Sequence, residues 1–158
     1  MFPRPAAVRI VEVGPRDGLQ NVSNLVPTST KIELIRRLRE AGLQTIELTS
    51  AVSPKAIPQL ADRELVLSHQ TVKGLQAQPG LRLPVLVPNS RGLELALKHG
   101  VKEVAVFVSA TEGFSKANIN VSVAQGLERA RDVARRAKNA GVAIRGFVTY
   151  ACSPSLPS

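Results

Sequence analysis

Apolar runs and helically spaced apolar residues alternate along this chain, and the alternation predicts its fold. Short apolar runs bounded by polar residues, glycine or proline are typical of strands. Such runs occur at residues 8–11, 44–49, 83–87, 102–109 and 142–149. The fourth run contains consecutive apolar residues over 104–108, as in strands that are covered on both faces. We therefore predict five strands, and we expect the first of them, 8–11, to be buried.

Helical patterns fill the stretches between the first three strands. Apolar residues at helical spacing over 32–38 predict one helix, which Gly42 ends. The pattern from Thr30 to Glu33 is typical of a capping box, in which a hydroxyl and a carboxylate each bond the other residue's backbone amide. Residues 59–76 predict a second helix, which ends before a proline-glycine turn.

Two further helices are predicted in the second half of the chain. A short one ends at Gly100, and a longer one begins with the capping-box pattern of Ser122 and Gln125 and ends at Gly141. Residues 110–120 are predicted as a long polar loop between them. Five strands alternating with four helices predict an α/β fold with a parallel sheet and right-handed crossovers.

The composition excludes several classes of function. The 158 residues carry 21 Lys and Arg against 12 Asp and Glu, a net charge of +9 that would suit an anionic partner. Aromatic residues make up only 3% and the basic residues are scattered, so we expect no nucleic-acid binding. The single cysteine, Cys152, excludes an internal disulfide and suits a reducing compartment. No apolar run approaches the ~20 residues of a membrane span, so we expect no membrane insertion.

The candidate chemistry lies in the loop after the first strand. Arg16 and Asp17 stand side by side there, and Gly18 follows them. The ends of parallel strands are where α/β folds keep their functional side chains, although an Arg-Asp turn on a solvated surface explains the pair equally well. Glu47, near the end of the second strand, is flanked by Ile46 and Leu48. A lone strand glutamate is more often a surface residue, but this flanking favours an interior position.

Residues 11–21, Val-Glu-Val-Gly-Pro-Arg-Asp-Gly-Leu-Gln-Asn, resemble the opening motif of 3-hydroxy-3-methylglutaryl-CoA lyases, which are metal-dependent TIM-barrel enzymes. Further blocks follow in that family's order, at 46–50, 52–55, 58–59, 61–62, 84–86, 88–89, 102–104, 118–120 and 145–146. A complete eightfold barrel needs roughly 200 residues or more. The resemblance therefore implies a partial TIM barrel over 1–150, of about five strands and four helices, and an irregular tail over 151–158. Its last strand would be an open edge, so we expect self-association or marginal stability.

The resemblance also implies an activity and roles for three residues. The family cleaves its acyl-CoA substrate to acetyl-CoA and acetoacetate with a divalent metal, Mg²⁺ or Mn²⁺. By the motif, Asp17 would be a metal ligand, Arg16 would stabilise the developing enolate oxygen and Glu47 would orient Arg16. A carboxylate suits a hard metal ion, and a fixed cation suits developing negative charge.

The family's remaining site residues have no counterpart in this sequence. These are a histidine pair one residue apart, an asparagine on a late strand and a cysteine in a glycine-rich loop. His69 and His99 lie thirty residues apart in predicted helices, where we expect surface positions, and Cys152 receives no role. We therefore expect the isolated chain not to catalyse the lyase reaction.

Two alternatives remain open beside a lyase. In the first alternative, the chain is a non-catalytic relative that acts by association. In the second, it is a lyase or synthase for another acyl-CoA. Ala51 and Ala56, which stand where the family has aromatic residues, keep the second alternative open.

The resemblance further implies an acyl-CoA substrate and a homo-oligomer. The positive charge would suit the phosphates of coenzyme A, and Lys55 and Asn89 are candidate contacts to which we assign no role. The resemblance also points to the mitochondrial matrix. Only seven residues precede the first predicted strand, which indicates no transit peptide, so the cytoplasm is the alternative location.

Overall fold

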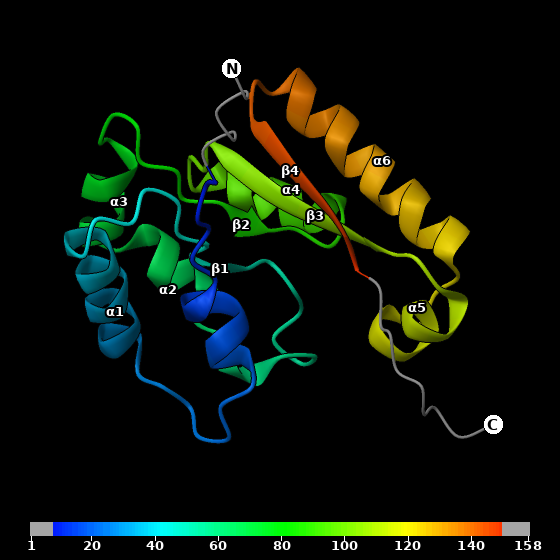
Figure 1. The fold of residues 1–158 in the computed structure, drawn as a ribbon, viewed down its shortest axis with the longest axis horizontal. Coiled ribbons are helices and arrows are strands. Elements are labelled where there is room, and N and C mark those ends of the chain that lie inside the picture. Colours follow the sequence, from blue (N-terminus) through cyan, green and yellow to red (C-terminus); the bar gives the residue numbers. More distant parts are fainter. Residues whose placement is uncertain (1–7, 150–158) are drawn as a thin grey trace, which may run out of the picture.

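The computed structural model describes residues 8–149, which form one parallel sheet with helices packed against it (Figure 1). The strands lie in the order β1-β2-β3-β4, and every neighbouring pair is parallel. Their bounds are Thr49–Ser50 for β1, Val85–Leu86 for β2, Glu103–Ser109 for β3 and Ala143–Thr149 for β4. The predicted parallel α/β fold is confirmed.

The first two strands of this sheet are short because prolines interrupt the ladder. Leu48 N donates to the carbonyl of Pro84 at 3.0 Å, but Pro84 has no N–H to return. Outside β1, the segment predicted as a strand at 44–49 contributes only isolated parallel bridges, Thr45 with Arg82 and Ile46 with Glu12. These bridges are parallel, so the segment still runs in the direction that the prediction of a parallel strand requires.

The predicted buried strand at 8–11 is wrong. Val8 is 91% exposed and Ile10 is 66% exposed, and the segment joins the sheet only at the bridge of Glu12. Within residues 8–149 nothing packs against its outer side, so its apolar side chains remain in solvent although their pattern is that of a strand.

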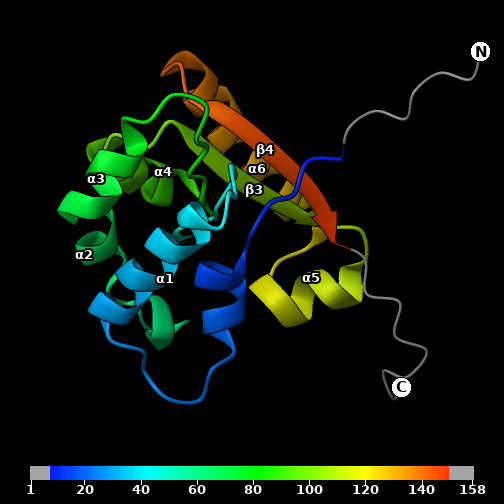
Figure 2. The ribbon, with the colours of Figure 1, turned by 60° about the vertical axis from the view of Figure 1, so that its left-hand side comes forward.

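Figures 1 and 2 show the helices along the outer side of the sheet, with α5 and the turn η1 at the ends toward which the strands run. The α-helices are α1 Thr28–Glu40, α2 Arg63–Ser68, α3 Gln70–Gln76, α4 Ser90–Lys98, α5 Glu112–Ile119 and α6 Val123–Asn139. The turn η1 spans Gly14–Gly18 as a single π-helical turn, and η2 spans Pro58–Leu60 as a 3₁₀ turn.

Two predictions about helices require correction. The helix predicted over 59–76 is broken at His69, whose extended backbone (φ −62°, ψ 138°) separates α2 from α3 while its Nδ1 accepts a bond from Thr71 N. The loop predicted over 110–120 contains α5. This helix packs on α6, where a Cβ added at Gly126 would lie 3.5 Å from Ile119, and this tertiary contact outweighs the polar local sequence.

The two predicted capping boxes have opposite outcomes. The box at Ser122 is confirmed, since Ser122 Oγ accepts from Gln125 N and Gln125 Oε1 accepts from Ser122 N. The box at Thr30 is wrong, because α1 begins two residues earlier, after Pro27. Glu33 instead accepts bonds from Arg36 and Arg37, which lower its pKa to about 2.

The core lies between the sheet and the outer helices. It includes fully buried Ile35 from α1, Leu67 from α2, Leu93 from α4 and Val104 from β3. The close packing of these side chains holds the strands in place against the helices. The polar side chains on the other face of the sheet converge at the ends of these strands.

β4 is an edge strand within the described residues, because it pairs with β3 alone. Ile144 is 38% exposed and Val148 is 68% exposed on it. The open edge predicted for the last strand is confirmed, while self-association stays a prediction. The tail at 151–158, with Cys152, lies outside the described residues. Within 8–149, no helix combines the length and apolar character needed to cross a bilayer.

Candidate active site

The turn η1 places Arg16 and Asp17 at the end of the Glu12 bridge. The amides of Arg16 and Asp17 both donate to the carbonyl of Val13, at 3.1 and 2.7 Å. Glu12 Oε1 accepts from Gly14 N at 2.6 Å, and a Cβ at Gly14 would lie 2.7 Å from that oxygen. A side chain at this position would push aside the Glu12 carboxylate, which accepts the bond from the Gly14 amide.

Arg16 and Glu47, which the family resemblance implies to be neighbours, are in contact. Arg16 Nε donates to Glu47 Oε1 at 2.5 Å, and the Glu47 carboxylate is fully buried. Arg16 itself is only 9% exposed. Burying two opposite charges is tolerated only when they are paired and hydrogen-bonded, so the contact fixes the arginine in one orientation.

The ion pair extends at both ends. Arg16 Nη1 donates to Asp17 Oδ1 at 2.5 Å, and the Asp17 side chain is half exposed. Arg145 Nη1, from β4, donates to the second oxygen of Glu47 at 3.1 Å. The four groups form a chain of alternating charge, Asp17–Arg16–Glu47–Arg145, whose formal charges cancel. Two of the five N–H donors of Arg16 are used within it.

This chain of charges borders a pocket of about 500 Å³ at the ends of the strands. Its wall combines polar groups with three phenylalanines; the lining residues are Arg16, Asp17, Gln20, Ser50, Val52, Ala56, Ile57, Leu86, Pro88, Phe107, Phe114, Asn118, Ile119, Phe147 and Thr149. The rings of Phe107 and Phe147 stack with centroids 6.0 Å apart, and the Arg145 guanidinium lies 5.4 Å from the Phe147 centroid. A cation at the rim of a partly apolar pocket can bind an anionic or polarised oxygen while the phenylalanines hold an apolar group.

The sequence analysis assigned no role to Arg145 and Phe147. The signal was present, since alternate residues of a strand share a face and the run 142–149 therefore places Arg145, Phe147 and Thr149 together. What the sequence could not supply was the distance across the sheet from this face to Glu47.

None of the other candidates lines the Arg16 pocket. His69 is exposed at the start of α3, as predicted, but His99 has a side chain only 11% exposed, so its predicted surface position is wrong. Its Nε2 lies 3.5 Å from Glu64 Oε2, and the neighbouring His99 and Lys98 lower the pKa of Glu64. Lys55 is exposed in a turn, and Asn89 caps α4 by accepting from Gly92 N at 3.0 Å.

A divalent metal would find one suitable ligand here. Asp17 offers a carboxylate oxygen, the donor that Mg²⁺ and Mn²⁺ prefer, and its side chain is accessible from the pocket. Within residues 8–149, however, no three His, Cys, Asp or Glu side chains are grouped to hold an ion. Asp17 therefore fits as a single metal ligand, and residues 8–149 alone form no complete metal site.

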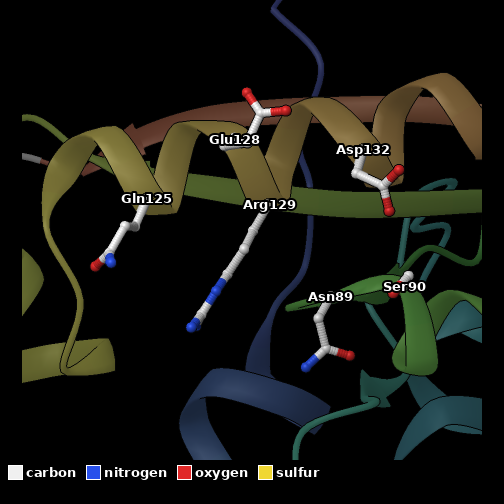
Figure 3. Close-up of a pocket in the computed structure, with 6 residues that line it drawn as sticks. All are labelled: Asn89, Ser90, Gln125, Glu128, Arg129 and Asp132. Atoms are coloured by element: carbon white, nitrogen blue, oxygen red, sulfur yellow. The ribbon is translucent and has the colours of Figure 1, made fainter.

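A separate pocket of about 390 Å³ lies between the start of α4 and α6 (Figure 3). Figure 3 shows Gln125 and Arg129 extending from α6 into the space beside Asn89. The carboxylates of Glu128 and Asp132 also line it, and neighbouring Arg135 and Arg136 lower the pKa of Asp132. This pocket shares no lining residue with the Arg16 pocket.

A curved parallel sheet with outer helices, carrying a buried ion pair at the strand ends, is part of a TIM-barrel enzyme fold. The chain belongs to the HMGL-like family, whose sequence profile matches residues 7–156.

Its curated relatives are lyases. It is 51% identical to the mitochondrial hydroxymethylglutaryl-CoA lyase of Bos taurus over 145 residues, which cover 92% of this chain and 43% of the bovine protein. It is 50% identical to the mitochondrial enzyme of Arabidopsis thaliana, covering 98% of this chain and 33% of that protein. It is 49% identical to the cytoplasmic 3-hydroxy-3-methylglutaryl-CoA lyase of Danio rerio, covering 93% and 42%. The chain thus spans less than half the length of these relatives.

Solved structures of lyases are also similar to this chain. The hydroxymethylglutaryl-CoA lyase of Pseudomonas aeruginosa superposes with a TM-score of 0.80 at 46% identity, covering 89% of this chain and 45% of that one. An HMG-CoA lyase of Acinetobacter baumannii, solved in complex with coenzyme A and 3-methylmalate, gives a TM-score of 0.81 at 32% identity, covering 94% and 47%. The predicted partial barrel of the lyase family is confirmed.

Proposed function

We propose that this chain forms the N-terminal part of the active centre of a hydroxymethylglutaryl-CoA lyase, a carbon–carbon lyase. The reaction cleaves 3-hydroxy-3-methylglutaryl-CoA to acetoacetate and acetyl-CoA. The observation that carries the proposal is the Arg16 guanidinium held at the pocket by the fully buried Glu47. Family membership and about 50% identity to lyases support it.

Arg16 supplies a fixed cation where negative charge develops. When the substrate's hydroxyl loses its proton, the oxygen becomes the ketone of acetoacetate and the adjacent carbon–carbon bond breaks. The bonding electrons pass to the acetyl-CoA fragment as an enolate, which is then protonated. N–H donors of Arg16 not engaged by Glu47 and Asp17 are available to the enolate oxygen, and preorganised donors of this kind are usually the largest single catalytic contribution.

Glu47 and Arg145 act as positioning residues. Glu47 contacts Arg16 through one oxygen and Arg145 through the other, so the carboxylate is held at both ends. A guanidinium fixed in this way needs little reorganisation when charge develops beside it, which is the condition for electrostatic catalysis.

Asp17 would hold the divalent metal, Mg²⁺ or Mn²⁺, as one ligand among several. When bound, such an ion polarises the oxygens of the substrate. Because Asp17 also accepts a bond from Arg16, it couples the position of the cation to that of the metal ligand. We assign no residue among 8–149 to the removal of the hydroxyl proton.

The wider setting is inferred from the relatives. An acyl-CoA substrate follows from their names and from the coenzyme A bound to the Acinetobacter lyase. The mitochondrial matrix is the inferred location, with the cytoplasm of the zebrafish relative as the alternative. A homo-oligomer is proposed with them, from the family resemblance.

A graft tests the proposed reaction. Residues 8–149 would replace the matching segment of the Pseudomonas lyase, and acetoacetate release from 3-hydroxy-3-methylglutaryl-CoA would be measured with Mg²⁺ or Mn²⁺. Turnover is expected from the graft and not from the isolated 158-residue chain. A folded graft that cleaves only a different acyl-CoA thioester would favour another lyase of this family, because Ala56 lines the pocket and leaves it wider than an aromatic residue would.

A second candidate function is association without catalysis, which the open edge of β4 favours. Association would be measured by mixing the chain with a full-length lyase. A stable complex together with a folded but inactive graft would support this candidate and contradict the first.

A further inference from the structure

A buried cluster of polar groups joins the start of α1 to η2 and to the start of α2. Lys31, on α1, is only 5% exposed, and its ammonium group donates to the Gln59 carbonyl at 2.5 Å and to Asp62 Oδ1 at 2.6 Å. The Thr28 hydroxyl donates to the other carboxylate oxygen of Asp62 at 2.7 Å. We call these four residues, Thr28, Lys31, Gln59 and Asp62, the Lys31 cluster. None of them lines the Arg16 pocket.

The Asp62 carboxylate bonds to α1 rather than to its own helix. Asp62 is the N-cap residue of α2, a position where an aspartate usually accepts a bond from an amide of the first helical turn. Within residues 8–149 its side chain forms no such bond, and its two oxygens accept from Lys31 and Thr28 instead. Because a buried ammonium group is tolerated only when it is paired and hydrogen-bonded, this contact fixes how the start of α1 lies against the start of α2.

The Lys31 cluster connects two segments that border the Arg16 pocket. The segment between η1 and α1 lines the pocket with Gln20, and the segment between β1 and η2 lines it with Ala56 and Ile57. Gln59 links the two segments directly, because its Nε2 donates to the Val22 carbonyl at 3.1 Å. A shift of one segment against the other therefore changes the shape of the pocket wall.

We propose that Lys31 and Asp62 are positioning residues for the Arg16 pocket. Their ion pair holds the segment after η1 against the segment after β1, and so sets the wall that receives the substrate. The identity of that substrate rests on the proposed function. Within residues 8–149 the pair forms no hydrogen bond with Arg16 or Glu47, whose own bond fixes the cation. Losing the pair should therefore weaken substrate binding and leave the chemical step nearly unchanged.

Two variants remove the pair to different degrees. Lys31→Met keeps an unbranched side chain without its charge, and Asp62→Asn keeps an acceptor, so the second variant remains informative if the first does not fold. Glu103→Gln is the matched control. It weakens the ion pair of the buried Glu103 with Arg82, at the ends of the strands opposite the pocket, and neither residue lines the pocket. Circular dichroism would verify that each variant is folded.

Amide hydrogen exchange of the 158-residue chain, followed by NMR, tests the positioning without any bond cleavage. The amides of Val22, Ile57 and Leu60, in the two segments and in η2, are hydrogen-bonded. We expect Lys31→Met and Asp62→Asn to speed their exchange about tenfold, because the segments open locally more often, and Glu103→Gln to change it less than about twofold. Unchanged exchange in the folded variants, or equal acceleration in the control, would overturn the proposal.

Kinetics of the lyase graft separate positioning from a purely structural role. We expect Lys31→Met and Asp62→Asn each to raise KM for 3-hydroxy-3-methylglutaryl-CoA about tenfold and to change kcat less than about twofold, while Glu103→Gln changes neither. Faster exchange with an unchanged KM would mean that the pair is structural only, and the proposal would be wrong. If the graft without these substitutions releases no acetoacetate, the proposed lyase reaction fails, and the exchange measurement alone decides whether the pair holds the two segments.

Discussion

Glu47 Oε1 accepts a hydrogen bond from Arg16 Nε at 2.5 Å, and the whole carboxylate is closed off from solvent. The second oxygen accepts from Arg145, which lies 98 residues further along the chain and on β4, at the far side of the sheet from β1. A bond that spans two intervening strands requires a curved sheet. The orientation of Arg16 therefore depends on the curvature of the barrel wall as well as on its own loop.

Replacing Glu47 should destabilise the fold more than any exposed charge does. Glu47→Gln leaves Arg16 buried beside a neutral amide, and breaking a buried ion pair costs about 3–5 kcal/mol. Urea denaturation of the 158-residue chain would measure the free energy of unfolding. Glu33→Gln, which breaks exposed pairs on α1, serves as the control and should lower the free energy of unfolding far less, because solvent screens those pairs. Equal losses in the two variants would contradict a structural role for the buried pair.

Arg145→Gln should act through Glu47. The Arg145 side chain is 31% exposed, so its loss should cost only about 1–2 kcal/mol, less than that of Glu47. In the lyase graft, Arg145→Gln should lower kcat and leave KM constant, as expected when a residue that positions a catalytic group is lost. The kcat of the graft that carries both Arg145→Gln and Glu47→Gln should be no lower than that of the graft with Glu47→Gln alone. Additive losses would show that Arg145 acts independently of Glu47.

The fold was predictable where the local pattern and the tertiary contacts agree. The parallel order of the strands follows from the alternation of strands and helices, and Ser122 caps α6 as its spacing predicts. The pattern failed at 8–11, because an apolar run becomes a buried strand only when something covers it. It also failed at 110–120, where packing against α6 gives α5 a stability that its polar composition does not indicate.

Three residues of the site could be predicted from the sequence, but the further residue that contacts them could not. The resemblance named Arg16, Asp17 and Glu47, and the structure brings these three together. Arg145 could have been placed on the inner face by strand alternation, but its bond to Glu47 depends on how strongly the sheet curves.

The contrast between the two predicted capping boxes can be tested directly. Ser122→Ala removes a bond to an orphan helix amide and should lower stability by about 1 kcal/mol. Thr30→Ala alters an exposed residue inside α1 and should change it by less than about 0.5 kcal/mol. Thermal melts followed by circular dichroism would compare the two variants. A larger loss for Thr30→Ala would mean that α1 begins where the sequence pattern placed it.

The exposed edge of β4 should make the chain associate with itself. Val148→Lys replaces an exposed apolar side chain with a charge, a substitution that blocks pairing of sheet edges. Losing burial of one valine, about 1.5–3 kcal/mol, should raise the concentration needed for association roughly tenfold or more. Sedimentation velocity over a concentration series would show the shift. Leu127→Lys, at an exposed site on α6, is the matched control and should have no such effect; equal shifts would place the contact elsewhere.

The most direct test of the central claim is the turnover of the lyase graft with and without Arg16. Acetoacetate release from 3-hydroxy-3-methylglutaryl-CoA would be compared for the graft, its Arg16→Ala variant and an Arg37→Ala control on the exposed face of α1. Loss of one preorganised donor to a developing oxyanion lowers kcat by about 10²–10³-fold, so we predict that loss for Arg16→Ala and none for Arg37→Ala. A folded Arg16→Ala graft with undiminished kcat would contradict the role of the Arg16–Glu47 pair in catalysis.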